Sequence, residues 1–128
     1  MEAIVTGVNW LAVGISTVLS FMLGAFWYSQ MAFGKKWAEG VGVDSGSDAK
    51  QPVAALVIQF VGTFLLAWIV ALAFALEALS AAILIVITVS ILLMAGSMFG
   101  GNSRYATITE GSFVLAMAVI MIGTNTIL

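Results

Sequence analysis

The sequence predicts an all-α membrane protein in which four transmembrane helices form a small antiparallel bundle. Of its 128 residues, 62% are hydrophobic, and only four basic and six acidic residues are charged. These charges leave four uncharged runs, 3–34, 51–76, 78–103 and 111–128, which contain 32, 26, 26 and 18 residues. A helix needs roughly 20 apolar residues to cross a bilayer core, so each run is long enough for one crossing. The composition excludes a water-soluble globular domain, a disordered chain and a secreted disulfide scaffold.

The residue inventory also restricts the chemistry. The chain contains no cysteine and no histidine. Thiol catalysis, thiolate metal sites, the commonest metal ligand and the usual general base are therefore excluded. A net charge of −2, with no basic cluster beyond Lys35 and Lys36, argues against a nucleic-acid partner. We expect no catalytic residue, no cofactor and no metal site, and we expect the lipid bilayer as the main surroundings of the chain.

The uncharged runs give the helix boundaries within a single transmembrane domain. Trp10 and Trp27 lie near the two ends of the first run, which suits the aromatic belts at the two membrane interfaces. Asp48 is a suitable N-cap for the second helix, with Pro52 in its first turn. The predicted helices cover about residues 8–29, 50–76, 80–100 and 107–127, and a loop is predicted over 30–49.

The segment after the first helix allows two interpretations. Residues 31–37 mix aromatic rings with Lys35 and Lys36, and residues 38–50 are rich in glycine, serine and alternating charge. The second stretch is typical of a loop. The first either lies along the membrane surface, with its rings in the interface and its ammonium groups in water, or is a plain turn.

The basic residues predict the orientation of the chain in the membrane. Four crossings place Lys35, Lys36, Lys50 and Arg104 on one side, and no lysine or arginine on the other. Basic residues in short loops favour the cytoplasmic side. We therefore expect both termini to lie outside the cytoplasm.

Small residues recur every four positions on three of the predicted helices. Such rows let helix backbones approach closely in lipid, where association depends on close packing and hydrogen bonds. The predicted helix-packing residues are Ala12, Ser16, Ser20 and Gly24 in the first helix, Ala67, Ala71 and Ala75 in the second, and Gly96 and Gly100 in the third.

Several polar side chains are candidates for a polar pathway or for hydrogen bonds between helices. Bonds between helices are the commoner use of such residues in membrane bundles. For Glu110 we expect a helix-capping role rather than proton coupling, because Thr107 and Glu110 have the spacing of a capping box. The candidates are Asn9, Gln59, Thr63, Glu110 and Asn125.

An aromatic ridge follows one face of the second helix. Phe60, Phe64 and Trp68 are spaced four residues apart and therefore share a face. The ridge faces lipid, another helix or a ligand, and the sequence does not distinguish these three environments.

Three segments near the N-terminus resemble the signature of a known family. They are Asn-Trp-Leu-Ala-Val at 9–13, Leu-Gly-Ala-Phe-Trp-Tyr-Ser at 23–29 and Phe-Gly-Lys-Lys-Trp at 33–37. The chain resembles a widespread bacterial family of small four-helix membrane proteins that has no assigned function. The resemblance implies four helices and a bacterial inner membrane, but no activity. Gln30 stands where the family has proline, which leaves open whether the first helix continues toward Phe33.

These observations favour a non-enzymatic membrane component, either a self-associating bundle or an accessory subunit of a larger complex. Three helices carry rows of small residues, and the chain has little mass outside the membrane. The alternative is a small oligomeric transporter or channel for a small solute or cation. An enzyme is the least favoured class, because its general acid or base would have to come from Glu77, Glu110 or a loop carboxylate.

Overall fold

The computed structural model describes residues 2–29, 31–42 and 53–128. Within these residues the chain forms helices and no strand: α1 (Glu2–Val5), α2 (Trp10–Trp27), α3 (Gly34–Val41), α4 (Val53–Ala75), α5 (Leu79–Phe99) and α6 (Arg104–Ile127). Helices α2, α4, α5 and α6 are long and apolar enough to cross a membrane. The predicted all-α membrane class is therefore confirmed, and the short helices α1 and α3 are additions to it.

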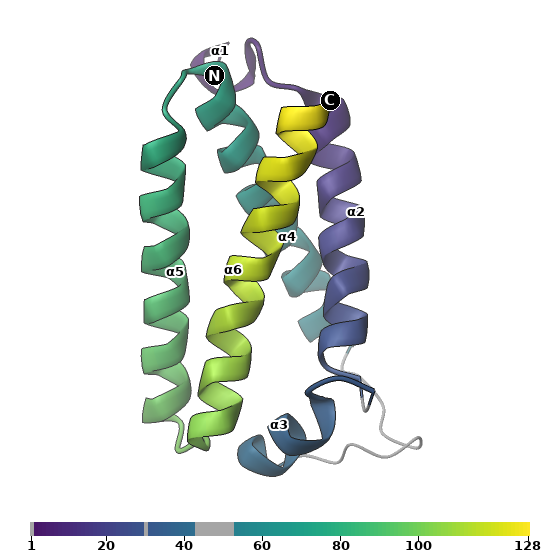
Figure 1. Cartoon of the computed structure of the whole chain (residues 1–128), viewed down its shortest axis with the longest axis vertical. Coiled ribbons are helices and arrows are strands. Elements are labelled where there is room, and N and C mark those ends of the chain that lie inside the picture. Colours follow the sequence, from purple (N-terminus) through teal and green to yellow (C-terminus); the bar gives the residue numbers. More distant parts are fainter. Residues whose placement is uncertain (1, 30, 43–52) are drawn as a thin grey trace.

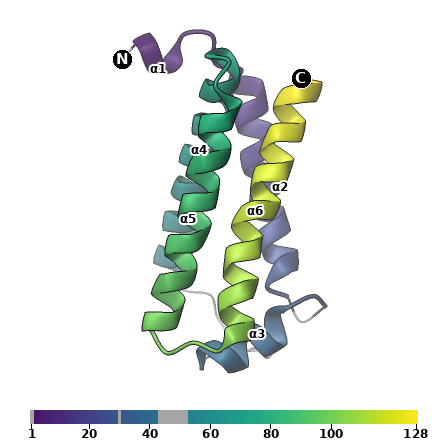
Figure 2. The same cartoon turned by 60° about the vertical axis from the view of Figure 1, so that its left-hand side comes forward.

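The four long helices run side by side and alternate in direction (Figure 1). Both chain ends and the turn between α4 and α5 lie at one end of the molecule. Helix α3 and the connection between α5 and α6 lie at the opposite end, where α3 crosses below the long helices (Figure 2). The termini thus share one end, as the number of crossings requires.

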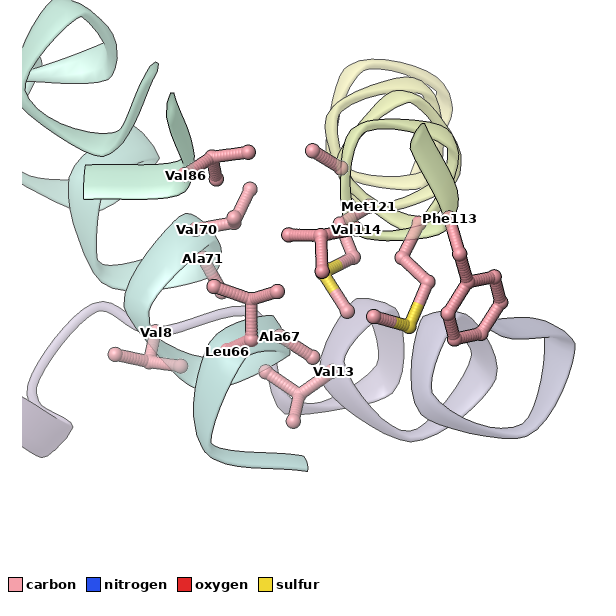
Figure 3. Close-up of a cluster of buried hydrophobic side chains, with 12 residues drawn as sticks. Val8, Val13, Leu66, Ala67, Val70, Ala71, Val86, Phe113, Val114 and Met121 are labelled. Carbon is pink, nitrogen blue, oxygen red and sulfur yellow. The ribbon is translucent and has the colours of Figure 1, made fainter. Parts of the chain in front are cut away.

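Helix α6 is the central helix of the structure. It contacts α2, α3, α4 and α5. Its most apolar stretch is 50% buried, against 17% for α5, which has the least buried stretch of the four. Figure 3 shows Val114 and Met121 of α6 facing Val13 of α2 and Val70 of α4 across the core. The hydrophobic core therefore forms around α6, while α5 keeps most of its surface outside it.

Helix α2 begins and ends inside the predicted range of 8–29. The Asn9 Oδ1 atom accepts a hydrogen bond from the Ala12 N–H at 3.1 Å, so Asn9 is the N-cap. This assignment replaces the expected bond from Asn9 to another helix. At the other end the Tyr28 N–H donates to the Gly24 carbonyl at 3.1 Å, and the regular helix stops at Trp27.

The small residues of α2 and α4 mostly face the interior. Ala12, Ser16 and Ser20 are each 0% exposed. The Ser16 hydroxyl donates to the Ala12 carbonyl at 2.6 Å, a bond within its own helix that lets a polar residue lie in an apolar seam. In α4, Ala67 and Ala71 are buried, whereas Ala75 is exposed near Gly7.

The glycine pair of α5 does not pack within the described part of the chain. Gly96 and Gly100 are exposed, and a Cβ atom added to Gly96 would meet no other atom within 4 Å. Gly100 is the C-cap of α5 rather than a packing position. Within the described residues this pair brings no two helices together, so its predicted helix-packing role stays a prediction.

Helix α6 starts one turn earlier than the predicted residue 107. Ser103 has extended backbone angles and its Oγ accepts from the Ala106 N–H at 3.1 Å, so Ser103 is the N-cap. Thr107 does not cap the helix, because its Oγ1 donates to Ser97 Oγ on α5 at 3.2 Å. The helix therefore begins after the Ser103 cap, and the Thr107–Glu110 capping box is not formed.

The predicted loop over 30–49 contains a helix. Residues Gly34–Val41 form α3, which packs against α6 and buries Ala38 to 2% exposure. The expected loop is wrong for these residues because tertiary contact with α6 stabilises a helix that the local composition disfavours. The Asp48 cap, Pro52 and the helix start at residue 50 lie outside the described residues. The first long helix ends at Trp27 and does not continue toward Phe33.

Candidate functional site

The clearest convergence of polar and aromatic side chains lies where α2, α3 and α6 meet. Tyr28 follows the last residue of α2, Trp37 lies in the middle of α3, and Glu110 and Phe113 belong to α6. We call the set Trp27, Tyr28, Phe33, Trp37, Glu110 and Phe113 the anchor cluster. It lies at the end of the molecule that carries α3.

Two indole hydrogen bonds connect the cluster to α6. The Trp37 Nε1–H donates to Glu110 Oε2 at 2.9 Å, and the Trp27 Nε1–H donates to the Thr109 carbonyl at 3.0 Å. The first bond is charge-assisted when Glu110 is ionised, and such bonds are stronger than those between neutral groups. Glu110 therefore holds α3 on α6. The predicted capping role of Glu110 is wrong, since Ser103 caps the helix.

Aromatic rings fill the space around these bonds. The ring of Tyr28 meets Trp37 at 4.9 Å and 64°, and it meets Phe113 at 5.4 Å and 73°, between centroids. Trp27 meets Phe33 at 4.8 Å and Phe113 at 6.0 Å. Edge-to-face contacts at these separations contribute beyond simple burial. Together the rings fill the space where α2, α3 and α6 meet.

Glycines permit the close approach of α3 to its neighbours. A Cβ atom on Gly34 would collide with the backbone carbonyl of Tyr28, and the Gly34 N–H donates to the Ser29 carbonyl at 2.8 Å. At the other end of α3, the Gly40 carbonyl accepts from the Ser103 N–H at 3.0 Å. The helix is thus held at both ends and in its middle.

Burial affects the phenol of Tyr28. Desolvation raises the pKa of the Tyr28 hydroxyl well above its usual value, and the nearby Glu110 carboxylate raises it further. The phenol consequently stays neutral at any physiological pH.

Gly24 lies beside the same region, where a Cβ would approach the Phe113 ring to 3.0 Å. A large side chain at position 24 would have to displace Phe113.

The remaining polar candidates bond within their own helices. Gln59 Nε2 lies 3.4 Å from Thr63 Oγ1, and Thr63 Oγ1 donates to the Gln59 carbonyl at 2.7 Å. Asn125 Nδ2 donates to the Met121 carbonyl at 2.8 Å. The structure therefore does not bring Gln59, Thr63 and Asn125 to Glu110. Within the described part of the chain, the expected bonds from these three residues to other helices are not formed.

The aromatic ridge of α4 contacts α2 and the N-terminal segment. The Phe60 ring lies 5.4 Å from the Phe21 ring, and Trp68 lies 5.2 Å from Trp10. The Trp68 Nε1–H donates to the Ile4 carbonyl at 2.7 Å. Phe64 packs against the core. Of the three environments open to the ridge, contact with another helix is formed, and Phe60 is also 42% exposed.

The hydrogen bonds between α5 and α6 were not predicted from the sequence. The Ser90 hydroxyl donates to the Gly111 carbonyl at 2.9 Å, and Ser97 Oγ accepts from Asn102 Nδ2 at 2.9 Å. Serines at positions 90 and 97 are two helical turns apart and so share one face, which was a usable signal. The partners of Trp37 had no such signal, because 73 residues separate Trp37 from Glu110.

Potential metal ligands do not gather in the described part of the chain. Across 2–29, 31–42 and 53–128, no group of three or more His, Cys, Asp or Glu side chains lies close enough together to hold a metal ion. The anchor cluster supplies one carboxylate, two indole N–H donors and a phenol. In this arrangement its chemistry is that of a contact between helices.

Comparison with known proteins identifies a family. A family model described as a protein of unknown function (DUF1761) covers residues 11–126. This span includes every member of the anchor cluster. No curated protein and no solved structure matches the chain.

Proposed function

Since this chain belongs to the DUF1761 family, whose function is unknown, we propose that it is a non-enzymatic component of the bacterial inner membrane that self-associates. The observation that supports self-association is the open face of α5. This helix has the least buried apolar stretch of the four long helices, at 17%. An accessory subunit of a larger complex would use the same face toward a different protein.

The open face centres on Gly96. Leu92 and Leu93 precede it by about one turn and Phe99 follows it, and these side chains are 65%, 41% and 93% exposed. A Cβ atom on Gly96 would meet nothing within 4 Å. A glycine between large apolar side chains lets a second helix approach closely, which is the main source of helix association in lipid.

The test is the oligomeric mass in a mild detergent, with Gly96→Leu compared with Gly62→Leu. Gly62 of α4 is a matched control, because a Cβ there would also meet nothing within 4 Å. We expect wild type and Gly62→Leu to form the same oligomer and Gly96→Leu to shift toward the monomer. A monomeric wild type would overturn self-association, and a stoichiometric second membrane protein in native-membrane preparations would then favour the accessory-subunit role. An unchanged oligomeric mass for Gly96→Leu would overturn the assignment of α5 as the surface of self-association.

We also propose that the end carrying α3 faces the cytoplasm and that both termini face outward. Helix α3, which contains Lys35 and Lys36, and the start of α6 at Arg104 lie at that end, and both termini lie at the other (Figure 1). Basic residues close to transmembrane helices favour the cytoplasmic side. Single cysteines are easy to place, because the chain has none. An impermeant maleimide applied to intact cells should label Leu128→Cys, and it should label Ser45→Cys only after permeabilisation. The reverse pattern would overturn the orientation.

A small oligomeric transporter or channel is the second candidate. It is favoured by Glu110, an ionisable side chain in a helix long enough to cross the membrane. Such residues commonly mark substrate or ion pathways. The Glu110 substitutions described in the Discussion separate this candidate from the first.

A further inference from the structure

We propose that the end of the molecule carrying α3 binds the phosphate of an anionic phospholipid headgroup, through Lys36 of α3 and Arg104 of α6. Both side chains are exposed. They are 68 positions apart in the sequence, and only the docking of α3 on α6 brings their two segments together. The proposal does not depend on self-association through α5, which involves another face of the molecule.

The docking of α3 places Lys36 beside the start of α6. The Lys36 Nζ atom lies 5.5 Å from the centroid of the Tyr105 ring, within the range of a cation–π contact. Arg104 is the residue before Tyr105. The Gly40 carbonyl accepts from the Ser103 N–H at 3.0 Å, which holds the end of α3 directly at this point. Two cations from separate helices therefore flank one short stretch of α6.

Among the described residues of this region, the acidic side chains leave the two cations available. Glu110 accepts the Trp37 indole N–H at 2.9 Å and so faces the anchor cluster. Glu39 is exposed on α3, four residues after Lys35 rather than after Lys36. Residues three apart and four apart on a helix are both neighbours, so the single charge of Glu39 is shared between the two lysines. Lys36 differs from Lys35 in its contact with the Tyr105 ring of α6. Lys36 and Arg104 are thus the cations best placed for an external anion.

The depth of the two cations fits a lipid headgroup. Trp27, Tyr28, Trp37 and Tyr105 gather at this end of the long helices, and such aromatic side chains are typical of the membrane interface. Lysine and arginine at this level extend their charged groups toward the headgroups. Arginine can bind phosphate with two parallel hydrogen bonds, and lysine adds a compact charge. The complementary anion at this depth is a phospholipid phosphate.

The test measures lipid binding to purified protein in detergent by native mass spectrometry. Short-chain phosphatidylglycerol, phosphatidylcholine with the same acyl chains, and inorganic phosphate are added separately. We expect wild type to retain phosphatidylglycerol in preference to phosphatidylcholine. We expect Lys36→Gln and Arg104→Gln each to weaken retention by about fivefold, the factor typical of one basic residue near an anionic membrane surface. Lys36→Arg should retain most of the binding.

Lys35→Gln is the matched control, since it removes the same charge from the neighbouring position of α3, about 100° around the helix. It should weaken retention clearly less than Lys36→Gln. An equal loss in the two variants would mean diffuse attraction and would overturn the site. Equal binding of the two lipids would also overturn it, as would displacement of phosphatidylglycerol by inorganic phosphate at equal concentration. Thermal unfolding without added lipid should be unchanged in Lys36→Gln and Arg104→Gln, and a lowered midpoint would show that the cations stabilise the fold instead.

Discussion

Replacing Gly34 with alanine is expected to detach α3 from the long helices and to destabilise the protein by about 1–3 kcal/mol, the usual range for overpacking. The added Cβ would collide with the Tyr28 backbone carbonyl. A backbone carbonyl cannot rotate away as a side chain can, so the effect should lie at the upper end of that range. The measurements are the thermal unfolding midpoint in detergent and hydrogen exchange at the backbone amides of α3.

Gly62→Ala provides the control for this substitution. The added Cβ at position 62 would meet no atom within 4 Å, and Gly62 lies inside α4. Alanine in a helix interior is favoured over glycine by about 1 kcal/mol, so this variant should be as stable as wild type or slightly more stable. If Gly34→Ala keeps the wild-type unfolding midpoint and the wild-type protection of the α3 amides from exchange, α3 does not approach Tyr28 as closely as described.

Replacing Glu110 with leucine is expected to cost about 1.5–3 kcal/mol, the usual worth of a hydrogen bond to a charged group. The substitution removes the acceptor of the Trp37 indole N–H and leaves this donor partly buried without a partner. Glu110→Gln should cost less, because its amide carbonyl can still accept the same hydrogen bond. The measurement is the unfolding midpoint, together with the fluorescence of Trp37.

A double-mutant cycle separates this bond from general packing. Trp37→Phe removes the donor and keeps an aromatic ring, so its effect should not add to that of Glu110→Leu. Gln59→Leu is the control, because the described side-chain bond of Gln59 is to Thr63 within α4, so its effect should be additive with that of Trp37→Phe. Additive effects of Glu110→Leu and Trp37→Phe would contradict the anchoring role of Glu110.

The same variants distinguish the two candidate functions. If the protein only assembles in the membrane, proteoliposomes should show no flux of a monovalent cation such as rubidium above the protein-free level. A reproducible flux in wild type that Glu110→Gln abolishes, while folding is retained, would favour the transporter. Glu110 would then carry the ion pathway in addition to holding α3.

Helix positions were largely predictable from the uncharged runs. The predicted 80–100 agrees within one residue at each end with α5 (Leu79–Phe99), and the predicted 8–29 contains α2 (Trp10–Trp27). Hydropathy works here because every backbone polar group in a bilayer core must be bonded internally, which makes a long apolar run helical. The start of α6 was less predictable, because Ser103 and Thr107 are both acceptable caps and the choice depends on Ser97 of the neighbouring helix.

The candidate site was predictable only in part. The aromatic and glycine residues of 23–37 stood out in the sequence, but their contacts did not. Glu110 was among the candidates for hydrogen bonds between helices, and it forms one with Trp37. The capping role expected for it is wrong, because the capping-box pattern considers only residues within one turn. Trp37, which determines its role, lies 73 residues away.

The sequence by itself determined that this is a membrane protein with four long apolar helices, because length and hydropathy are properties of each segment alone. Tertiary structure alone decided that Gly34–Val41 is a helix and that α6 is the centre of the core. It also decided that Glu110 holds Trp37 and that Gly96 faces away from the other described residues. The physical reason is that most of the surface of each apolar helix suits lipid as well as protein, so hydropathy does not select helix partners. Partners are selected by close packing and by a few hydrogen bonds between residues far apart in the chain.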